Sequence, residues 1–207
     1  MVIGTDYGGW PVIPATLPKH PLIYSFGVGE DVSFDIGMVE QFGATIHAFD
    51  PTPRSNQWIK GQSLPQAFHF HQLGLAGRDA IVPFFPPAGE GHVSFSNAPA
   101  GNQSGDPVLA EVCALDTIMQ RLGHNKIDVL KMDIEGFEYQ VIEALKSGPH
   151  MPRLILVEFH HGMYQATDSD TIAADQHLHK LGYDLFYVSP TGREYGYVQR
   201  NYESLDN

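Results

Sequence analysis

Short apolar runs alternate with amphipathic stretches along most of this chain. The apolar runs predict buried strands at residues 22–26, 44–50, 67–77, 127–134 and 153–161. Between them, apolar residues spaced three or four apart predict helices at residues 32–43, 115–123, 138–148 and 171–182. Alternating strands and helices indicate a mostly parallel sheet with right-handed crossovers, which is a doubly wound α/β fold.

The last two predicted strands, residues 183–189 and 194–200, follow one another without a helix between them. They therefore predict an antiparallel hairpin at one edge of the sheet. We expect residues 1–207 to form a single domain, with a Gly- and Pro-rich N-terminal arm over residues 1–20. Residues 78–108 are interpreted as a loop-rich insertion in which residues 81–85 and 92–96 pair as a hairpin.

Three residues are expected to set helix ends. Asp116 is predicted to cap the start of the helix at residues 115–123, and Gly123 to end it. Gly148 is predicted to end the helix that begins at Glu138.

The charge balance and the lengths of the apolar stretches argue against two kinds of partner. The net charge is −12 and the 12 Lys and Arg residues are scattered, whereas nucleic-acid binding needs clustered cations, so we expect no nucleic-acid partner. No stretch approaches the roughly 20 apolar residues of a membrane span, so no membrane partner is expected.

Cysteine usage points to a reducing compartment. The single cysteine, Cys113, excludes an intramolecular disulfide and a cysteine-based zinc site, and its apolar surroundings favour a core position. The first twenty residues hold Asp6 and three prolines, which is not the pattern of a signal peptide. We therefore expect a cytoplasmic location.

A glycine-containing turn after the first strand predicts a nucleotide site. Gly27 and Gly29 would let the backbone approach a ligand closely, and Asp50 ends the next strand 21 residues after Gly29, where an acid can bind ribose hydroxyls. The simpler alternative is that the glycines only form a turn and that Asp50 only caps the segment after Pro51. Glu30 and Asp31 would repel a pyrophosphate, and no Tyr precedes a Lys by four residues, so the turn favours S-adenosylmethionine over NAD.

A second cluster of acids and a histidine follows the fourth and fifth strands. Asp133 and Glu135 are predicted to act at the strand mouth, whereas Glu138 is interpreted as complementing the dipole of the next helix. Glu158 and His160 share a face, so Glu158 could orient His160 as a general base. Asp133, Glu158 and His160 could also hold Mg²⁺ or Mn²⁺, although a metal is not the favoured interpretation.

Four segments carry a resemblance to a known family. "SFGVGEDVSFD", "IHAFDPTP", "FHFHQLGLAG" and above all "IDVLKMDIEGFEYQVIEAL" resemble the FkbM-type methyltransferases, including the methyltransferase-like 24 branch. The resemblance implies a class I, Rossmann-like, S-adenosylmethionine-dependent methyltransferase with strand order 3-2-1-4-5-7-6. Family members that are understood methylate oxygen, often a hydroxyl on a sugar or natural product.

The resemblance also implies roles for individual residues. Gly27 and Gly29 would flank the methionine part of the cofactor, Asp50 would hold the ribose, and Leu75 and Ala76 would lie by the adenine. Asp133 and Glu135 would lie beside the reacting methyl group. Ser25 stands where an acid often precedes the first glycine, and Glu30 is our expectation for the group that holds the cofactor's amino end.

Methyl transfer to a hydroxyl requires alignment and loss of a proton. We expect His160, oriented by Glu158, or else Asp133, to accept that proton; a bound divalent ion is the alternative. The acceptor is expected to be a small molecule or sugar, held with help from Trp10, Phe84, Phe85 and Phe95. Two other functions stay open, a non-catalytic nucleotide-binding module and an NAD(P)-dependent oxidoreductase, and the sequence leaves the oligomeric state open.

Overall fold

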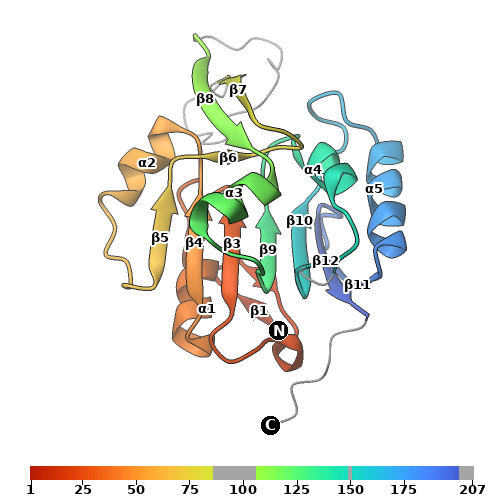
Figure 1. Cartoon of the computed structure of the whole chain (residues 1–207), viewed down its shortest axis with the longest axis horizontal. Coiled ribbons are helices and arrows are strands. Elements are labelled where there is room, and N and C mark those ends of the chain that lie inside the picture. Colours follow the sequence, from red (N-terminus) through yellow and green to blue (C-terminus); the bar gives the residue numbers. More distant parts are fainter. Residues whose placement is uncertain (86–105, 149–150, 201–207) are drawn as a thin grey trace.

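A mostly parallel sheet of seven strands forms the centre of the computed structural model, which describes residues 1–85, 106–148 and 151–200 (Figure 1). In spatial order its strands are β5 (Phe68–His71), β4 (Thr45–Phe49), β3 (Leu22–Phe26), β9 (Val129–Met132), β10 (Leu154–Glu158), β12 (Glu194–Gln199) and β11 (Tyr183–Val188). Counted along the chain within this sheet, the order is 3-2-1-4-5-7-6. Only β12 is antiparallel to its neighbours β10 and β11, so the expected edge hairpin is present.

Alternating side chains of the central strands pack against two separate sets of helices. Leu130 and Ile155 lie in one core cluster with α3 (Leu115–Leu122), α4 (Glu138–Ala144) and α5 (Asp168–Lys180). Their neighbours Val129 and Leu154 point to the opposite face, into a cluster with α1 (Ser33–Phe42) and α2 (Pro53–Ile59). The strands are apolar throughout because both faces of the sheet are covered.

The N-terminal arm is part of the second core cluster. It forms the strands β1 (Val2–Ile3) and β2 (Trp10–Pro11), which pair antiparallel, and the 3₁₀ turn η1 (Pro14–Thr16). Ile3, Trp10, Val12 and Leu17 are buried against α1 and the sheet. The arm therefore forms part of the layer that covers this face of the sheet.

The predicted third strand, residues 67–77, is wrong in its length. It divides into β5 and a separate two-residue strand, β6 (Gly74–Leu75), because the chain turns where the Leu73 N–H donates to the His71 carbonyl. β6 pairs parallel with β8 (Val108–Cys113), and β8 pairs antiparallel with β7 (Ala80–Phe84) to form a small second sheet. The second half of the predicted hairpin, residues 92–96, lies outside the described residues.

Two of the predicted helix ends differ from the structure. The cap of α3 is Ala114, whose N–H donates to Asp79, so Asp116 lies in the first turn and is not the cap. Gly123 ends α3 in the left-handed region, as predicted. Helix α4 ends at Ala144, before Gly148.

Two helix starts carry signals that the sequence interpretation did not use. Helix α2 was not predicted, yet Thr52 accepts a hydrogen bond from the Ser55 N–H and Pro53 occupies the first helical position. Helix α5 begins at Asp168, three residues before the predicted start, with a capping box between Thr167 and Asp170.

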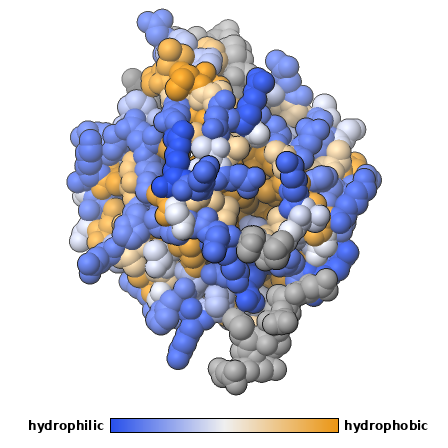
Figure 2. All heavy atoms as spheres, in the orientation of Figure 1, coloured by the Kyte–Doolittle hydropathy of each residue, from blue (hydrophilic) through white to orange (hydrophobic). Residues whose placement is uncertain are grey.

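The surface is predominantly polar, with hydrophobic side chains gathered over β7 and β8 (Figure 2). Ile81 and Leu109 project there and are 64% and 69% exposed. Cys113 is buried, as predicted, and burial raises the pKa of its thiol to about 11. Among the described residues, no helix has the length and apolar character needed to cross a membrane.

A histidine cluster lies on the outer strands of the sheet. His47 Nδ1 is 2.9 Å from His71 Nε2, and the His47 ring centroid lies 5.0 Å from that of His69 and 4.8 Å from that of His124. Burial, together with the neighbouring imidazoles, lowers the pKa of His47 to about 4 and also lowers the pKa of His71. These two rings therefore resist protonation while the protein is folded.

We expect acid to destabilise the protein through His47. Between its unfolded pKa near 6.5 and its folded pKa near 4, the unfolded chain binds more protons than the folded chain, so the free energy of unfolding falls as the pH drops. In His47→Val, the loss of stability between pH 7 and pH 5 should be smaller by about 1 kcal/mol, a figure reduced because the ring is partly exposed to solvent. Urea denaturation at both pH values measures the difference. His20→Asn, outside the cluster, is the control, and an equal reduction in that variant would contradict the assignment.

Candidate active site

A cavity of about 490 Å³ opens beyond the carboxyl ends of β3, β4, β9 and β10. The arm, the turns that follow these strands and the β11–β12 turn all contribute to its wall. Nine of the lining residues that the structure describes are acidic, and Lys131 is the one Lys or Arg among them. The acids are Asp6, Glu30, Asp31, Asp35, Asp50, Asp133, Glu135, Glu158 and Glu194. Such a cavity attracts cations and repels anions.

The turn after β3 needs both of its glycines, for different reasons. Gly27 has a φ of +81°, and a Cβ there would lie 1.8 Å from the carbonyl oxygen of Asp133. Gly29 has a φ of +54°, and a Cβ there would meet nothing within 4 Å, because this glycine borders the open cavity. The first glycine thus serves the contact between two turns, and the second leaves room for a ligand.

Asp50 holds this turn from the neighbouring strand. One carboxylate oxygen accepts from the Gly29 N–H at 3.0 Å, and the other accepts from the Thr52 N–H at 2.9 Å and the Thr52 hydroxyl at 2.6 Å. Asp50 also lines the cavity. Asp50 therefore does cap the segment after Pro51, as the simpler alternative states. It also remains in the cavity wall, where it can contact a ligand.

The other residues predicted to bind a cofactor divide into two groups. Leu75 and Glu30 line the cavity, and Glu30 is paired there with Arg54 at 2.8 Å. Ser25 and Ala76 do not line it: Ser25 is fully buried in the interior of β3, and Ala76 lines a separate cavity near α3 and α4. The structure thus brings Leu75 and Glu30 to the cavity and leaves Ser25 and Ala76 outside its wall.

A buried lysine under the turn was not predicted as a site residue. Lys131 is 5% exposed, and its Nζ donates to the carbonyl oxygens of Gly27 at 2.8 Å and Phe26 at 3.4 Å. The Nζ also lies 5.3 Å from the centroid of the Trp10 ring. Burial raises the pKa of Asp35 to about 6, although the charge of Lys131 acts to lower it. Lys131 is therefore the cation that compensates for part of the acidic charge.

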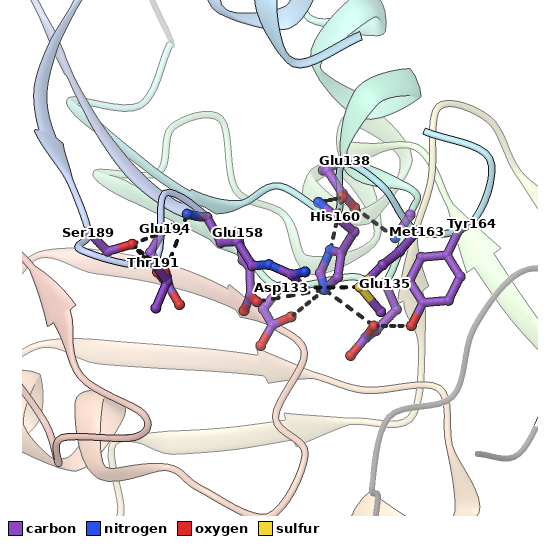
Figure 3. A network of polar contacts seen from close by, with 12 residues as sticks. Asp133, Glu135, Glu138, Glu158, His160, Met163, Tyr164, Ser189, Thr191 and Glu194 are labelled. Atoms are coloured by element: carbon purple, nitrogen blue, oxygen red, sulfur yellow. Dashed lines mark hydrogen bonds and ion pairs between the residues drawn. The ribbon is translucent and has the colours of Figure 1, made fainter. Parts of the chain in front are cut away.

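His160 lies at the centre of a group of four carboxylates (Figure 3). Its Nδ1 is 2.9 Å from Glu138 Oε1, and its Nε2 is 3.2 Å from Glu135 Oε2. Nε2 also lies 3.8 Å from Asp133 Oδ1 and 3.9 Å from Glu158 Oε1. The prediction that Glu158 orients His160 is therefore wrong, because Glu138 makes the hydrogen bond that sets the ring.

Glu138 does more than complement a helix dipole. It lies in the first turn of α4, but it is fully buried, and its carboxylate accepts three hydrogen bonds. Two come from the backbone N–H and Nδ1 of His160, and the third comes from the Gly136 N–H. Glu138 thereby ties the turn after β9 to the end of β10.

The cluster retains protons at neutral pH. Burial acts to lower the pKa of His160, but the hydrogen bond to Glu138 and the surrounding carboxylates raise it to about 9. Burial, with the charge of Asp133, raises the pKa of Glu158 to about 8. Burial also raises the pKa of Asp133 to about 6, although the charge of Lys131 acts to lower it. The group therefore holds positive charge between its carboxylates.

The backbone of this region adopts uncommon conformations. Glu135 has a φ of 51°, and Tyr164, whose hydroxyl donates to Glu135 Oε2 at 2.6 Å, has a φ of 49°. For residues other than glycine, the left-handed region costs roughly 1–2 kcal/mol, and such residues concentrate at functional sites. The Glu135–Tyr164 hydrogen bond holds two such residues together.

Comparison with known proteins assigns this chain to a family. Residues 19–185 match the methyltransferase FkbM domain. This chain belongs to the FkbM methyltransferase family. The FkbM match contains the glycine turn, Asp50, and His160 with the four carboxylates around it. The first eighteen residues of the arm lie outside the match.

Two curated relatives support the family assignment. Probable methyltransferase-like protein 24 from Rattus norvegicus is 33% identical over 128 residues, which are 61% of this chain and 29% of that protein. The protein of the same name from Homo sapiens is 32% identical over 128 residues, or 61% of this chain and 28% of that protein. This FkbM chain therefore spans less than a third of the length of these relatives.

A solved structure shows the same fold at low identity. The fibrillarin pre-rRNA processing protein of Methanococcus jannaschii aligns with 93% of this FkbM chain and 71% of its own, with a TM-score of 0.51 and 10% identity. This likeness shows the Rossmann-like fold of class I methyltransferases and confirms the predicted fold class.

Replacing Glu138 should destabilise the protein. In Glu138→Gln, the side-chain amide can supply only one acceptor oxygen, so at least one buried donor that now bonds Glu138 would lose its partner. We expect the free energy of unfolding to fall by about 2–4 kcal/mol, measured by urea denaturation. Glu143→Gln, an exposed acid on the same helix, is the matched control. A loss below about 0.5 kcal/mol in Glu138→Gln would contradict this account of the contacts.

Proposed function

We propose that this chain is an S-adenosylmethionine-dependent methyltransferase that methylates a hydroxyl group of a small molecule or sugar. The observation that supports it best is the acid-lined cavity at the strand ends of an FkbM domain. The family membership supports methyl transfer, and the charge of the cavity supports the choice of donor.

The charge of the cavity favours a cationic donor. S-adenosylmethionine carries a sulfonium and an ammonium group against one carboxylate, whereas a dinucleotide brings a pyrophosphate. Nine acids against one lysine would stabilise the first and repel the second. The same comparison disfavours an NAD(P)-dependent oxidoreductase.

The turn residues supply a cradle for this donor. The open space beside Gly29 admits the amino-acid part, Asp50 can accept from ribose hydroxyls with its remaining lone pairs, and Leu75 offers an apolar contact for the adenine. Glu30 lies where it could bind the amino end, in competition with Arg54. When bound, the donor supplies an electrophilic methyl group on a sulfonium sulfur.

Asp133 is the group best placed to accept the proton of the acceptor hydroxyl. The Asp133 side chain is 32% exposed and lines the cavity, whereas that of His160 is 4% exposed and lies behind the carboxylates. We therefore assign Asp133 as the group that receives the hydroxyl proton, and His160 as a positioning residue. Glu158 also lines the cavity beside Asp133, and its raised pKa favours the protonated form at neutral pH.

Aromatic side chains in the wall fit an acceptor with a ring. Trp10 and Phe84 line the cavity, as the sequence predicted, and Tyr7, Phe137 and Tyr187 line it as well. Phe85 is not part of the wall, and Phe95 lies outside the described residues. Aromatic faces pack well against the apolar faces of sugars and other rings.

Calorimetric titration tests the donor and its site. Wild-type protein should bind S-adenosylmethionine and show no heat of binding with NAD. Asp50→Ala should weaken donor binding by about 10- to 100-fold, since it removes hydrogen bonds between a charged group and the ribose. Asp116→Ala removes an exposed acid outside the cavity wall, so it is the matched control and should bind as wild type.

The alternatives give different results in the same titration and in a turnover assay. Binding of NAD would support the oxidoreductase. Binding of the methyl donor without its conversion to S-adenosylhomocysteine in the presence of any hydroxyl acceptor would support a non-catalytic binding module. Failure of both ligands to bind correctly folded protein would overturn the proposed function.

A further inference from the structure

We propose that Asp133, Glu158 and His160 form a binding site for a divalent metal ion in the wall of the cavity. Carboxylate oxygens from the ends of β9 and β10 and an imidazole nitrogen two residues further on would be its protein ligands. The site is inferred from these side chains alone, and it does not require that the cavity bind a methyl donor.

The three ligand atoms already lie close enough together to share an ion. One oxygen of each carboxylate and one nitrogen of His160 all lie within 4.8 Å of one another. His160 Nε2 is 3.8 Å from Asp133 Oδ1 and 3.9 Å from Glu158 Oε1. Ligands that bind a metal at about 2.1 Å lie roughly 3 to 4 Å apart, so small movements would complete the site.

The environment of His160 is the one that metal-binding histidines need. Its side chain is 4% exposed, and Nδ1 is hydrogen-bonded to the buried Glu138, which fixes the ring and directs Nε2 into the carboxylates. Within the described part of the chain, Nε2 makes ion-pair contacts but no hydrogen bond. A carboxylate behind the ring is the outer-shell partner that orients metal-bound histidines and makes them more basic.

The excess of carboxylates at the site also favours the binding of a cation. Four carboxylates surround one imidazole, and the nearby Lys131 donates its hydrogen bonds to backbone carbonyls of the first turn. The ion would lie between the carboxylates that already surround Nε2. Glu135, held by Tyr164, lies 3.2 Å from Nε2 and could add a fourth ligand or accept from a metal-bound water.

The donor set favours a first-row metal ion of intermediate hardness. Magnesium prefers oxygen ligands and structural zinc prefers nitrogen and sulfur, whereas two or three carboxylates with one imidazole suit Mn²⁺. If the proposed function holds, this ion would lie where an acceptor hydroxyl approaches Asp133. It would then lower the pKa of a hydroxyl that coordinates to it.

Electron paramagnetic resonance of Mn²⁺ tests the site directly. Protein stripped with EDTA and dialysed is titrated with MnCl₂, and the loss of the free-ion signal counts the bound ions. We expect one ion per chain, with Glu158→Gln and Asp133→Asn each weakening binding at least tenfold. Glu143→Gln, exposed on α4, should bind as wild type.

The outcomes separate this proposal from the proposed function. His160→Gln should also lose the ion, and circular dichroism checks that each variant is folded. Asp133→Asn is nearly isosteric and its side chain is only partly buried, so this variant should best preserve folding. Absence of saturable Mn²⁺ binding by wild type, or equal binding by Glu158→Gln and Asp133→Asn, would overturn the metal site. Titration with S-adenosylmethionine in the presence of EDTA tests the donor separately, so either proposal can fail alone.

Discussion

The turns that follow β3 and β9 pack against each other at the carboxyl ends of these strands, and the rest of the site depends on that contact. Gly27 approaches the Asp133 carbonyl so closely that a Cβ would lie 1.8 Å from the oxygen. β3 and β9 are parallel neighbours, so their carboxyl ends emerge side by side. The close approach then places a glycine turn and an acidic turn in one cavity. Lys131 strengthens the junction from below, because it belongs to β9 but donates to carbonyls of the β3 turn.

Two buried basic side chains lie on opposite sides of this junction. The buried Lys131 lies on the side of α1 and Asp35, whereas the imidazole of His160 lies on the side of α4 and Glu138. Between them, the carboxylates that face the cavity are only partly compensated. Such an arrangement is costly for folding, since each buried charge loses hydration. The hydrogen bonds of Glu138, Asp50 and Lys131 supply partial compensation and hold the surrounding turns in place.

The sequence predicted the parts of the fold that repeat a local pattern. Apolar runs located the strands of the central sheet, and Gly27 and Gly29 located the first turn, because strand ends and glycine turns depend on adjacent residues. The division of residues 67–77 into two strands depends on β8, which lies more than thirty residues away, so no local pattern could show it. Helix α2 was missed although Thr52 and Pro53 form a local start signal.

The candidate site divides in the same way. Asp133 and Glu158 were predicted because they follow apolar strands, and both line the cavity. The partner of His160 was predicted wrongly because alternation along one strand placed Glu158 beside it, whereas the hydrogen bond comes from Glu138, 22 positions earlier in the chain. Ser25 lies outside the cavity wall, and its sequence position near a glycine turn could not show which way its side chain points.

The excess of carboxylates in the cavity has a consequence for turnover. A sulfonium donor that loses its methyl group becomes a neutral thioether, so the reaction removes the charge that the acidic wall attracts. If the proposed function holds, the cavity would attract the used donor less strongly than the fresh one. The same side chains that draw the donor in would therefore also help to expel it, and each cycle would end with its product already weakened in the site.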